Sequence, residues 1–263
     1  MRPALRAPHD AQGPTIDMLA GRNSVREALL AGRRRVYRLI VAEGAREAGV
    51  LEEIVALAGE HQVPVQRAPK VDLDALADAL SHQGVVAQAS PYPHAEVDDL
   101  LALASQRDQA PFLLMLDSLE DPQNVGSLMR TAEAVGVHGV MVPRHRAAGV
   151  TPAVSRASAG AVEHLLVAEV TNLARTLEWL KERGVWIVGI EDEPEAQDYR
   201  ALDLNMPLAL VVGSEGHGMH RLVRETCDLL ARLPMKGRIA SLNVSAAGSV
   251  MLYRALEARE ARG

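Results

Sequence analysis

Aromatic residues and cysteine are nearly absent from this sequence, and each absence excludes something. Aromatic residues make up 3% of the 263 residues, so a core must be built mainly from Ala, Val, Leu and Ile. Cys227 is the single cysteine, which excludes an intramolecular disulfide and fits a reducing, cytoplasmic setting. No apolar run is long enough to span a bilayer. We therefore expect a cytoplasmic protein with no membrane partner, and residues 1–15, which lack the apolar block of a secretory signal, should form a short disordered tail.

A basic balance is also missing. The formal net charge is −6, whereas binding to phosphates favours a basic surface. Residues 1–90 carry equal numbers of basic and acidic side chains, and their arginines are densely clustered. The cluster is either a solvated face or a local nucleic-acid-binding face, and charge alone leaves both interpretations open. The candidate nucleic-acid ligands are Arg22, Arg26, Arg33, Arg34 and Arg35.

Residues 16–90 are predicted to form a small α/β domain. Apolar runs with strand spacing alternate with runs at helical spacing, and that order favours a sheet covered by helices. The first helix is expected to begin at Ser24 as its N-cap. Two prolines follow the domain, so a linker with a helix over 96–105 is placed at residues 91–110. The expected strands are 36–41, 63–66 and 84–88, and the expected helices are 24–31, 46–61 and 72–80.

Residues 111–263 are predicted to form a larger α/β domain. Its strands are short and apolar and alternate with helices, which is typical of a parallel sheet that is covered on both faces. The expected strands are 112–117, 139–142, 164–167, 185–190, 208–212 and 231–233. The expected helices are 122–135, 152–161, 172–183, 220–227 and 245–259.

Three polar segments follow apolar strands of the second domain, where ligands bind in open α/β sheets. The first contains Asn124 and Arg130 at the start of a helix. An amide and a guanidinium fork suit a phosphate or carboxylate ligand, but a helix cap and a surface arginine would give the same pattern. The third segment places Ser241, Asn243 and Ser245 just before the final helix, where they could be capping residues or part of a site.

The second polar segment is the glycine-rich run at residues 213–218. Its glycines would let the backbone approach a ligand closely, and Glu215 lies among them; a solvated loop is the plainer interpretation. The spacing is not that of a dinucleotide-binding loop, and no phosphate-loop lysine follows, so a nicotinamide oxidoreductase is disfavoured. His217 and His220 have no further ligand cluster beside them, so we expect no metal site.

Taken together, the three segments resemble the three signature motifs of the SpoU (TrmH) family of SPOUT methyltransferases. DPQNVGSLMRTAEAVGV resembles the first motif, LALVVGSEGHGM the second, and RLPMKGRIASLNVSAAGSVMLYRAL the third. Their order and spacing match over roughly residues 110–259. In the first domain, GRNSVREAL and HQGVVAQ resemble the small, ribosomal-protein-like substrate-binding domain that many members carry. Joint occurrence is more specific than any one motif.

This resemblance implies a fold, a cofactor and a reaction. The second domain would be an α/β SPOUT domain with a parallel sheet and a deep trefoil knot, binding S-adenosylmethionine in the knot loops. Members act as homodimers whose active site is completed across the interface. The reaction would be methylation of a ribose 2′-hydroxyl in RNA. The two-part layout favours a guanosine of 23S rRNA, with a tRNA guanosine as second substrate class and a non-catalytic RNA-binding or ribosome-assembly factor as the alternative of another kind.

The resemblance also implies roles for single residues. In this family Arg130 would be the base, but arginine normally stays protonated. A cationic Arg130 could instead hold a phosphate and stabilise a developing alkoxide, and both roles stay open. The implied catalytic cluster is Arg130, Asn124, Glu215, Ser241 and Asn243. The implied cofactor contacts are Gly213, Ser214, Leu233 and Leu242.

Overall fold

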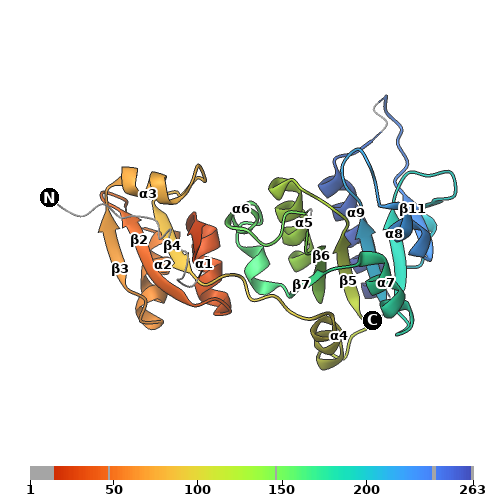
Figure 1. Ribbon diagram of the computed structural model, residues 1–263, viewed down its shortest axis with the longest axis horizontal. Helices are drawn as coiled ribbons and strands as arrows, with labels where there is room; N and C mark the ends of the chain where they lie inside the picture. The colour runs from red at the N-terminus through yellow and green to blue at the C-terminus, as the bar shows by residue number, and fades with distance from the viewer. Residues whose placement is uncertain (1–14, 47, 146, 239–240, 262–263) are drawn as a thin grey trace. The chain divides into compact units, whose positions relative to one another are not determined.

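A computed structural model describes residues 15–46, 48–145, 147–238 and 241–261 (Figure 1). The chain divides into two compact units. Unit 1 consists of Met1–Pro93 and Val150–His164, and unit 2 of His94–Gly149 and Leu165–Gly263. The first change of unit falls inside the expected linker. The segment Val150–His164, which was expected in the second domain, clusters with unit 1.

Unit 1 is built on a four-stranded mixed sheet of order β1-β4-β2-β3. Strand β4 runs antiparallel to both of its neighbours, and β2 pairs with β3 in parallel. Leu39 and Val41 of β2 join the core under α1 and α2, whereas Ile40 joins the core under α3. The elements are β1 (Asp17–Ala20), α1 (Arg22–Ala31), β2 (Val36–Ala42), α2 (Val50–Glu60), β3 (Val65–Ala68), α3 (Lys70–Leu76), β4 (Val85–Ala89), α6 (Pro152–Ala157) and the 3-10 helix η1 (Ala161–His164).

In unit 1 the predicted start of the first helix was wrong, and one strand was missed. Helix α1 begins at Arg22 behind Gly21, whose φ of 95° favours glycine, so Ser24 is not the N-cap. Ser24 is instead buried in the helix, and its Oγ donates to the carbonyl oxygen of Ser155 at 3.2 Å. The strand β1 was missed because four residues are too few to show an alternating pattern.

Unit 2 contains a seven-stranded sheet of order β7-β6-β5-β10-β8-β11-β9, and every pair of neighbours is parallel. This confirms the expected parallel sheet, while strand order does not test the expected knot, which stays a prediction. The elements are α4 (Val97–Gln106), β5 (Phe112–Leu116), α5 (Pro122–Ala134), β6 (Gly139–Pro143), β7 (Val167–Val170), α7 (Leu173–Lys181), β8 (Trp186–Ile190), β9 (Gln197–Asp198), η2 (Tyr199–Ala201), β10 (Leu208–Val212), α8 (Arg221–Thr226), β11 (Leu229–Arg232) and α9 (Val244–Glu260).

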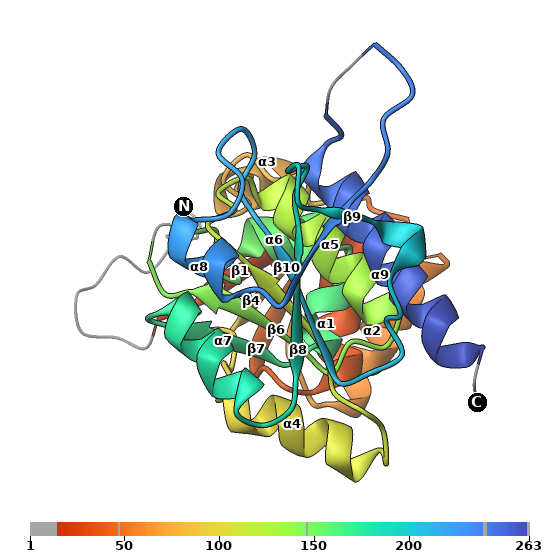
Figure 2. The ribbon, with the colours of Figure 1, turned by 90° about the vertical axis from the view of Figure 1, so that its right-hand side faces the viewer.

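Helices cover both faces of this sheet. Residues of α4, α7 and α8 share one core with alternate residues of the strands, and α5 and α9 pack together on the other side, where α9 also contacts β10 (Figure 2). The central strands β5 and β10 are buried along their whole length, which explains why they read as continuous apolar runs. Among the described residues, no helix is both long and apolar enough to cross a membrane.

Candidate functional site

Three polar side chains from separate segments meet in unit 2. Asn124 lies in the first turn of α5, Glu215 in the loop after β10, and Asn243 at the N-cap of α9. The Asn124 Nδ2 donates to Glu215 Oε1 at 2.7 Å. The Asn243 Nδ2 lies 3.0 Å from Asn124 Oδ1 and 3.1 Å from Glu215 Oε1. We call these three residues the amide–carboxylate cluster.

The N-cap role and the site role expected for Asn243 occur together. Its Oδ1 accepts the backbone N–H groups of Ser245 and Ala246, at 2.9 and 3.3 Å, and also the Ser245 hydroxyl. Its Nδ2 is thereby turned toward Asn124 and Glu215. One amide therefore fills both roles, because its oxygen caps the helix and its nitrogen faces the other two side chains.

The glycine-rich loop that carries Glu215 is closed on itself. Backbone hydrogen bonds of 2.9 and 3.0 Å link Ser214 and Gly218 in both directions. A Cβ at Gly213 would clash with the backbone of Gly218, and Gly218 itself has a φ of 65°. These two glycines therefore permit a close backbone approach that other residues would block.

Two cavities flank this loop. The first has a volume of about 650 Å³ and is lined by Asn124, Glu215, His217 and His220, among others. The second, of about 700 Å³, lies between the ends of β8, β10 and β11 and the start of α9. Residues Ser214, Glu215, Gly218 and Val244 line both. The amide–carboxylate cluster therefore stands where a ligand in one cavity would approach a ligand in the other.

The second cavity fits a cationic, partly apolar cofactor. Its described lining includes the carboxylates Glu191, Asp192 and Glu215, against the single basic side chain of Arg232. Burial raises the pKa of the Glu191 carboxyl, and the hydrogen bond from the Met219 N–H lowers it in part. Glu191 Oε2 is buried and has no hydrogen-bond partner among the described residues. The volume is in the range of small-molecule sites, about 300–1,000 Å³.

The expected site residues are distributed unevenly around these cavities. Gly213, Ser214, Leu233, Leu242 and Ser241 all line the second cavity, as Glu215 and Asn243 do. Arg130 is different: it is exposed on α5 and is not among the described residues lining either cavity. Arg130 lies six positions after Asn124, which turns the two side chains to different sides of the helix. Within one chain, Arg130 therefore stands apart from the cluster.

Sequence reasoning missed three titratable residues of this region. Asp117, whose side chain is fully buried, accepts two hydrogen bonds from His220, and Glu191 lines the second cavity. The available signal was position, because Asp117 and Glu191 each directly follow a buried strand. His220 was weighed only as a metal ligand and no metal site was expected there, so its pairing with Asp117 was not foreseen.

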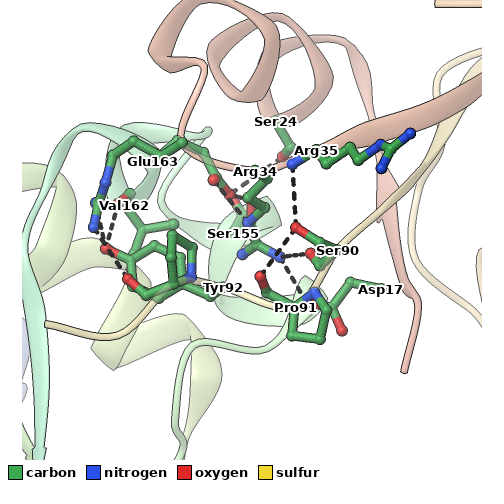
Figure 3. Close-up of polar contacts among 12 residues, drawn as sticks. Asp17, Ser24, Arg34, Arg35, Ser90, Pro91, Tyr92, Ser155, Val162 and Glu163 are labelled. Atoms are coloured by element: carbon green, nitrogen blue, oxygen red, sulfur yellow. Dashed lines mark hydrogen bonds and ion pairs between the residues drawn. The ribbon is translucent and has the colours of Figure 1, made fainter. Parts of the chain in front are cut away.

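The arginines of unit 1 differ in how far they are available to RNA. Arg34 was expected to bind RNA, but it is 4% exposed, and its guanidinium bonds to Asp17 at 2.6 Å and Glu163 at 2.8 Å (Figure 3). That expectation is corrected, because a buried guanidinium held between two carboxylates is not accessible to a phosphate. Arg33 bonds to the Tyr92 hydroxyl at 2.8 Å, whereas Arg35 is exposed.

The other two arginines are partly engaged by their own unit. Arg22 Nε donates to the carbonyl oxygen of Gln83 at 3.2 Å. Arg26 pairs with Glu27 at 2.6 Å and with Glu53 at 3.5 Å. These are partly exposed ion pairs, which are weak and exchangeable. Arg22 and Arg26 therefore stay candidates for RNA contact, together with Arg33 and Arg35.

Comparison with known proteins identifies the family of each part of the chain. The SpoU rRNA methylase family matches residues 111–253, and the domain described as RNA 2′-O ribose methyltransferase substrate binding matches residues 18–95. The Bacillus subtilis protein YacO, assigned by its name to the TrmH family of tRNA/rRNA methyltransferases, is 48% identical over 94% of this chain and 98% of its own.

Two solved structures share the fold. A structure described as an RNA 2′-O ribose methyltransferase aligns with a TM-score of 0.74 and 26% identity, over 93% of this chain and 89% of its own. The SpoU methyltransferase AviRb of Streptomyces viridochromogenes, crystallised with AdoMet, aligns with a TM-score of 0.76 and 23% identity, over 94% of this chain and 91% of its own. On the profile match and the 48% identity, this chain belongs to the SpoU methylase family.

Proposed function

We propose that this protein transfers the methyl group of S-adenosylmethionine to a ribose 2′-hydroxyl of RNA, with a guanosine of 23S rRNA as the leading target. The observation that carries the proposal is the amide–carboxylate cluster, held between two cavities that share one loop. Two ligands must meet in a methyl transfer, and this arrangement supplies adjoining places for them. The substrate-binding domain matched by residues 18–95 supports a ribose in RNA as the acceptor.

The second cavity would hold the cofactor. Gly213 and Ser214 supply backbone at the end of β10, while Leu233 and Leu242 supply apolar surface. The bound cofactor provides a methyl group on a cationic sulfur, so the leaving group is neutral and needs no acid. The chain's own task is to align the acceptor oxygen with that methyl group and to accept the hydroxyl proton.

The amide–carboxylate cluster would orient the ribose. Glu215 Oε1 already accepts two amide donors, which fixes this oxygen and leaves Oε2 for a hydroxyl donor. Asn124 is only 7% exposed and is locked by its partners, so it acts as a rigid support. Ser241 lines the second cavity with an exposed side chain that can reach the acceptor.

A homodimer would complete the site. Arg130 is exposed and stands apart from the cluster of its own chain, so we place it in the site of the partner subunit, where its cation would hold the phosphate beside the target ribose. Two large apolar side chains of α9 support an interface on that helix, since Val250 is 41% exposed and Tyr253 is 50% exposed.

Unit 1 would bind the body of the RNA. Arg35 is the most available of its candidate ligands, and Arg22, Arg26 and Arg33 would exchange their internal partners for phosphates. Local contacts of this kind reconcile RNA binding with a net charge of −6. The presence of this domain favours rRNA over tRNA, and the single, partly buried cysteine fits action in the cytoplasm.

The proposal is tested by methyl transfer from labelled S-adenosylmethionine to 23S rRNA, 16S rRNA and bulk tRNA prepared from a strain lacking this protein. We expect one 2′-O-methylguanosine in 23S rRNA, mapped at nucleotide resolution. Labelling of tRNA would keep the chemistry and overturn the substrate. If no RNA is labelled although RNA binds, the protein is a non-catalytic RNA-binding factor instead.

A further inference from the structure

Asp117 and His220 form a pair at the rim of the first cavity. Asp117 directly follows β5 and its side chain is fully buried, whereas the His220 side chain is 67% exposed. Asp117 Oδ1 lies 2.8 Å from Nδ1 of His220, and Asp117 Oδ2 accepts the backbone N–H of His220 at 2.7 Å. The Ser118 hydroxyl donates to Oδ1 at 3.1 Å. The imidazole is therefore held by a fixed, buried acceptor.

This contact sets the tautomer of His220. A carboxylate oxygen only accepts hydrogen bonds, so Nδ1 of the neutral ring carries the proton and Nε2 keeps its lone pair. Across the described part of the chain, Nε2 has no hydrogen-bond partner. The exposed end of the ring is thus a proton acceptor that is not used by the fold.

The Nε2 lone pair of His220 lies on a side chain that lines the first cavity. His220 lines the first cavity together with Asn124 and Glu215. The reaction of the proposed function needs a group that removes a proton, and a guanidinium is a poor one because it normally stays protonated. We infer that His220 is the general base that deprotonates the ribose 2′-hydroxyl, and that Asp117 is its positioning residue; the inference rests on the proposed function.

The step balances with these two residues. The hydroxyl proton passes to Nε2 of His220 as the ribose oxygen forms its bond to the methyl carbon, and the electron pair of the broken carbon–sulfur bond remains on sulfur. One positive charge is lost from the cofactor and one appears on the imidazolium, which the Asp117 carboxylate stabilises. The ring then returns its proton to water. Arg130 keeps the role of a phosphate ligand.

The test compares His220→Ala and His220→Asn with the wild type in single-turnover methyl transfer to RNA. The asparagine keeps a donor for Asp117 but has no basic nitrogen. We expect both variants to lose about 10²–10⁴-fold in rate, with cofactor affinity, measured by calorimetry, within about twofold. The melting temperature should be unchanged in His220→Asn, whereas His220→Ala takes one hydrogen-bond donor from the buried Asp117 and should melt slightly lower. Added imidazole should restore part of the rate of His220→Ala. His61→Ala, which removes an exposed histidine of unit 1, should match the wild type.

A second readout does not depend on activity. Nitrogen-15 NMR of the free, full-length protein should show His220 with a protonated Nδ1 and an unprotonated Nε2. A rate within about threefold of wild type in His220→Asn, or the opposite tautomer, would overturn the inference. If the wild type itself transfers no methyl group to any RNA, the proposed function fails and this inference fails with it, and that result is distinct from an active wild type with an active His220→Asn.

Discussion

In both units, polar side chains from distant parts of the sequence lie in contact, but the two groups of side chains differ in their surroundings. In unit 1, Arg34 and Glu163 are buried and bond to each other and to Asp17 and Ser155 (Figure 3). In unit 2, Glu215 and its amide partners face two cavities. A buried ion pair affects the stability of the fold but cannot reach a ligand, whereas a fixed group beside a cavity can act on one. The exposure of a polar group to a cavity therefore distinguishes a structural role from a chemical one.

The largest expected effect breaks the unit 1 network. Arg34→Ala would leave the carboxylate of Glu163, whose side chain is fully buried, without its cation. We expect the free energy of unfolding of unit 1 to fall by about 3–5 kcal/mol, measured by hydrogen exchange of the β2 amides. The exposed neighbour Arg35 gives the control, since Arg35→Ala should change the free energy of unfolding of unit 1 by about 0.5 kcal/mol or less. Loss of under about 1 kcal/mol in Arg34→Ala would mean that the network is not structural.

The next effect belongs to the cluster of unit 2. Asn124→Ala removes one of the two amide donors that fix Glu215 Oε1, and misplacing this carboxylate should lower the single-turnover rate by about 10²-fold. The free energy of unfolding should fall by about 1–3 kcal/mol, because the variant loses two hydrogen bonds, one to Glu215 Oε1 and one from Asn243 Nδ2. A full rate in this variant would remove Asn124 from the site.

A smaller effect tests the close packing of helix α4 on strand β6, away from the residues that line the two cavities. A Cβ at Gly139 of β6 would clash with the side chain of Leu100 on α4. Gly139→Ala should therefore destabilise unit 2 by about 1–3 kcal/mol, measured by thermal unfolding. Combining it with Leu100→Ala should recover part of the lost stability if the clash is the cause, and no recovery would point to a backbone effect instead.

The smallest effect concerns Cys227, a partly buried thiol at the end of α8. Burial raises the pKa of its thiol to about 12, so little thiolate exists at pH 8. Iodoacetamide should react with the native thiol about 10²-fold or more slowly than with the urea-unfolded chain. Equal rates would show that the Cys227 thiol is exposed and reactive in the folded protein, which would contradict its assignment as an inert, partly buried group.

The helices and strands of this fold were predicted from the sequence better than its polar side-chain contacts. The strand over 208–212 was located without error because it is buried on both faces and reads as one apolar run. The segments that carry Asn124, Glu215 and Asn243 were placed at one edge of the sheet because each follows a parallel strand. That these three residues form one cluster was implied only by the resemblance to the SpoU family. The expected limits of the RNA-binding domain, residues 16–90, stay a prediction. Unit 1 of the structure also includes Val150–His164, which no local pattern assigned to it.

What sequence could not supply was burial and pairing over long separations. A run of arginines has the same charge whether a member is exposed or not, so Arg34 was grouped with Arg35. Asp117 and His220 lie 103 residues apart, and no local pattern joins them. Tertiary packing decides both cases.

The most direct measurement makes the same substitution in each unit. Glu163→Gln and Glu215→Gln both neutralise a carboxylate of nearly unchanged shape, and each variant is followed by melting temperature and by single-turnover methyl transfer to RNA. We predict that Glu163→Gln melts at a lower temperature and keeps its rate per folded molecule, whereas Glu215→Gln melts with the wild type and loses about 10²–10³-fold in rate. A wild-type rate in Glu215→Gln would contradict the account.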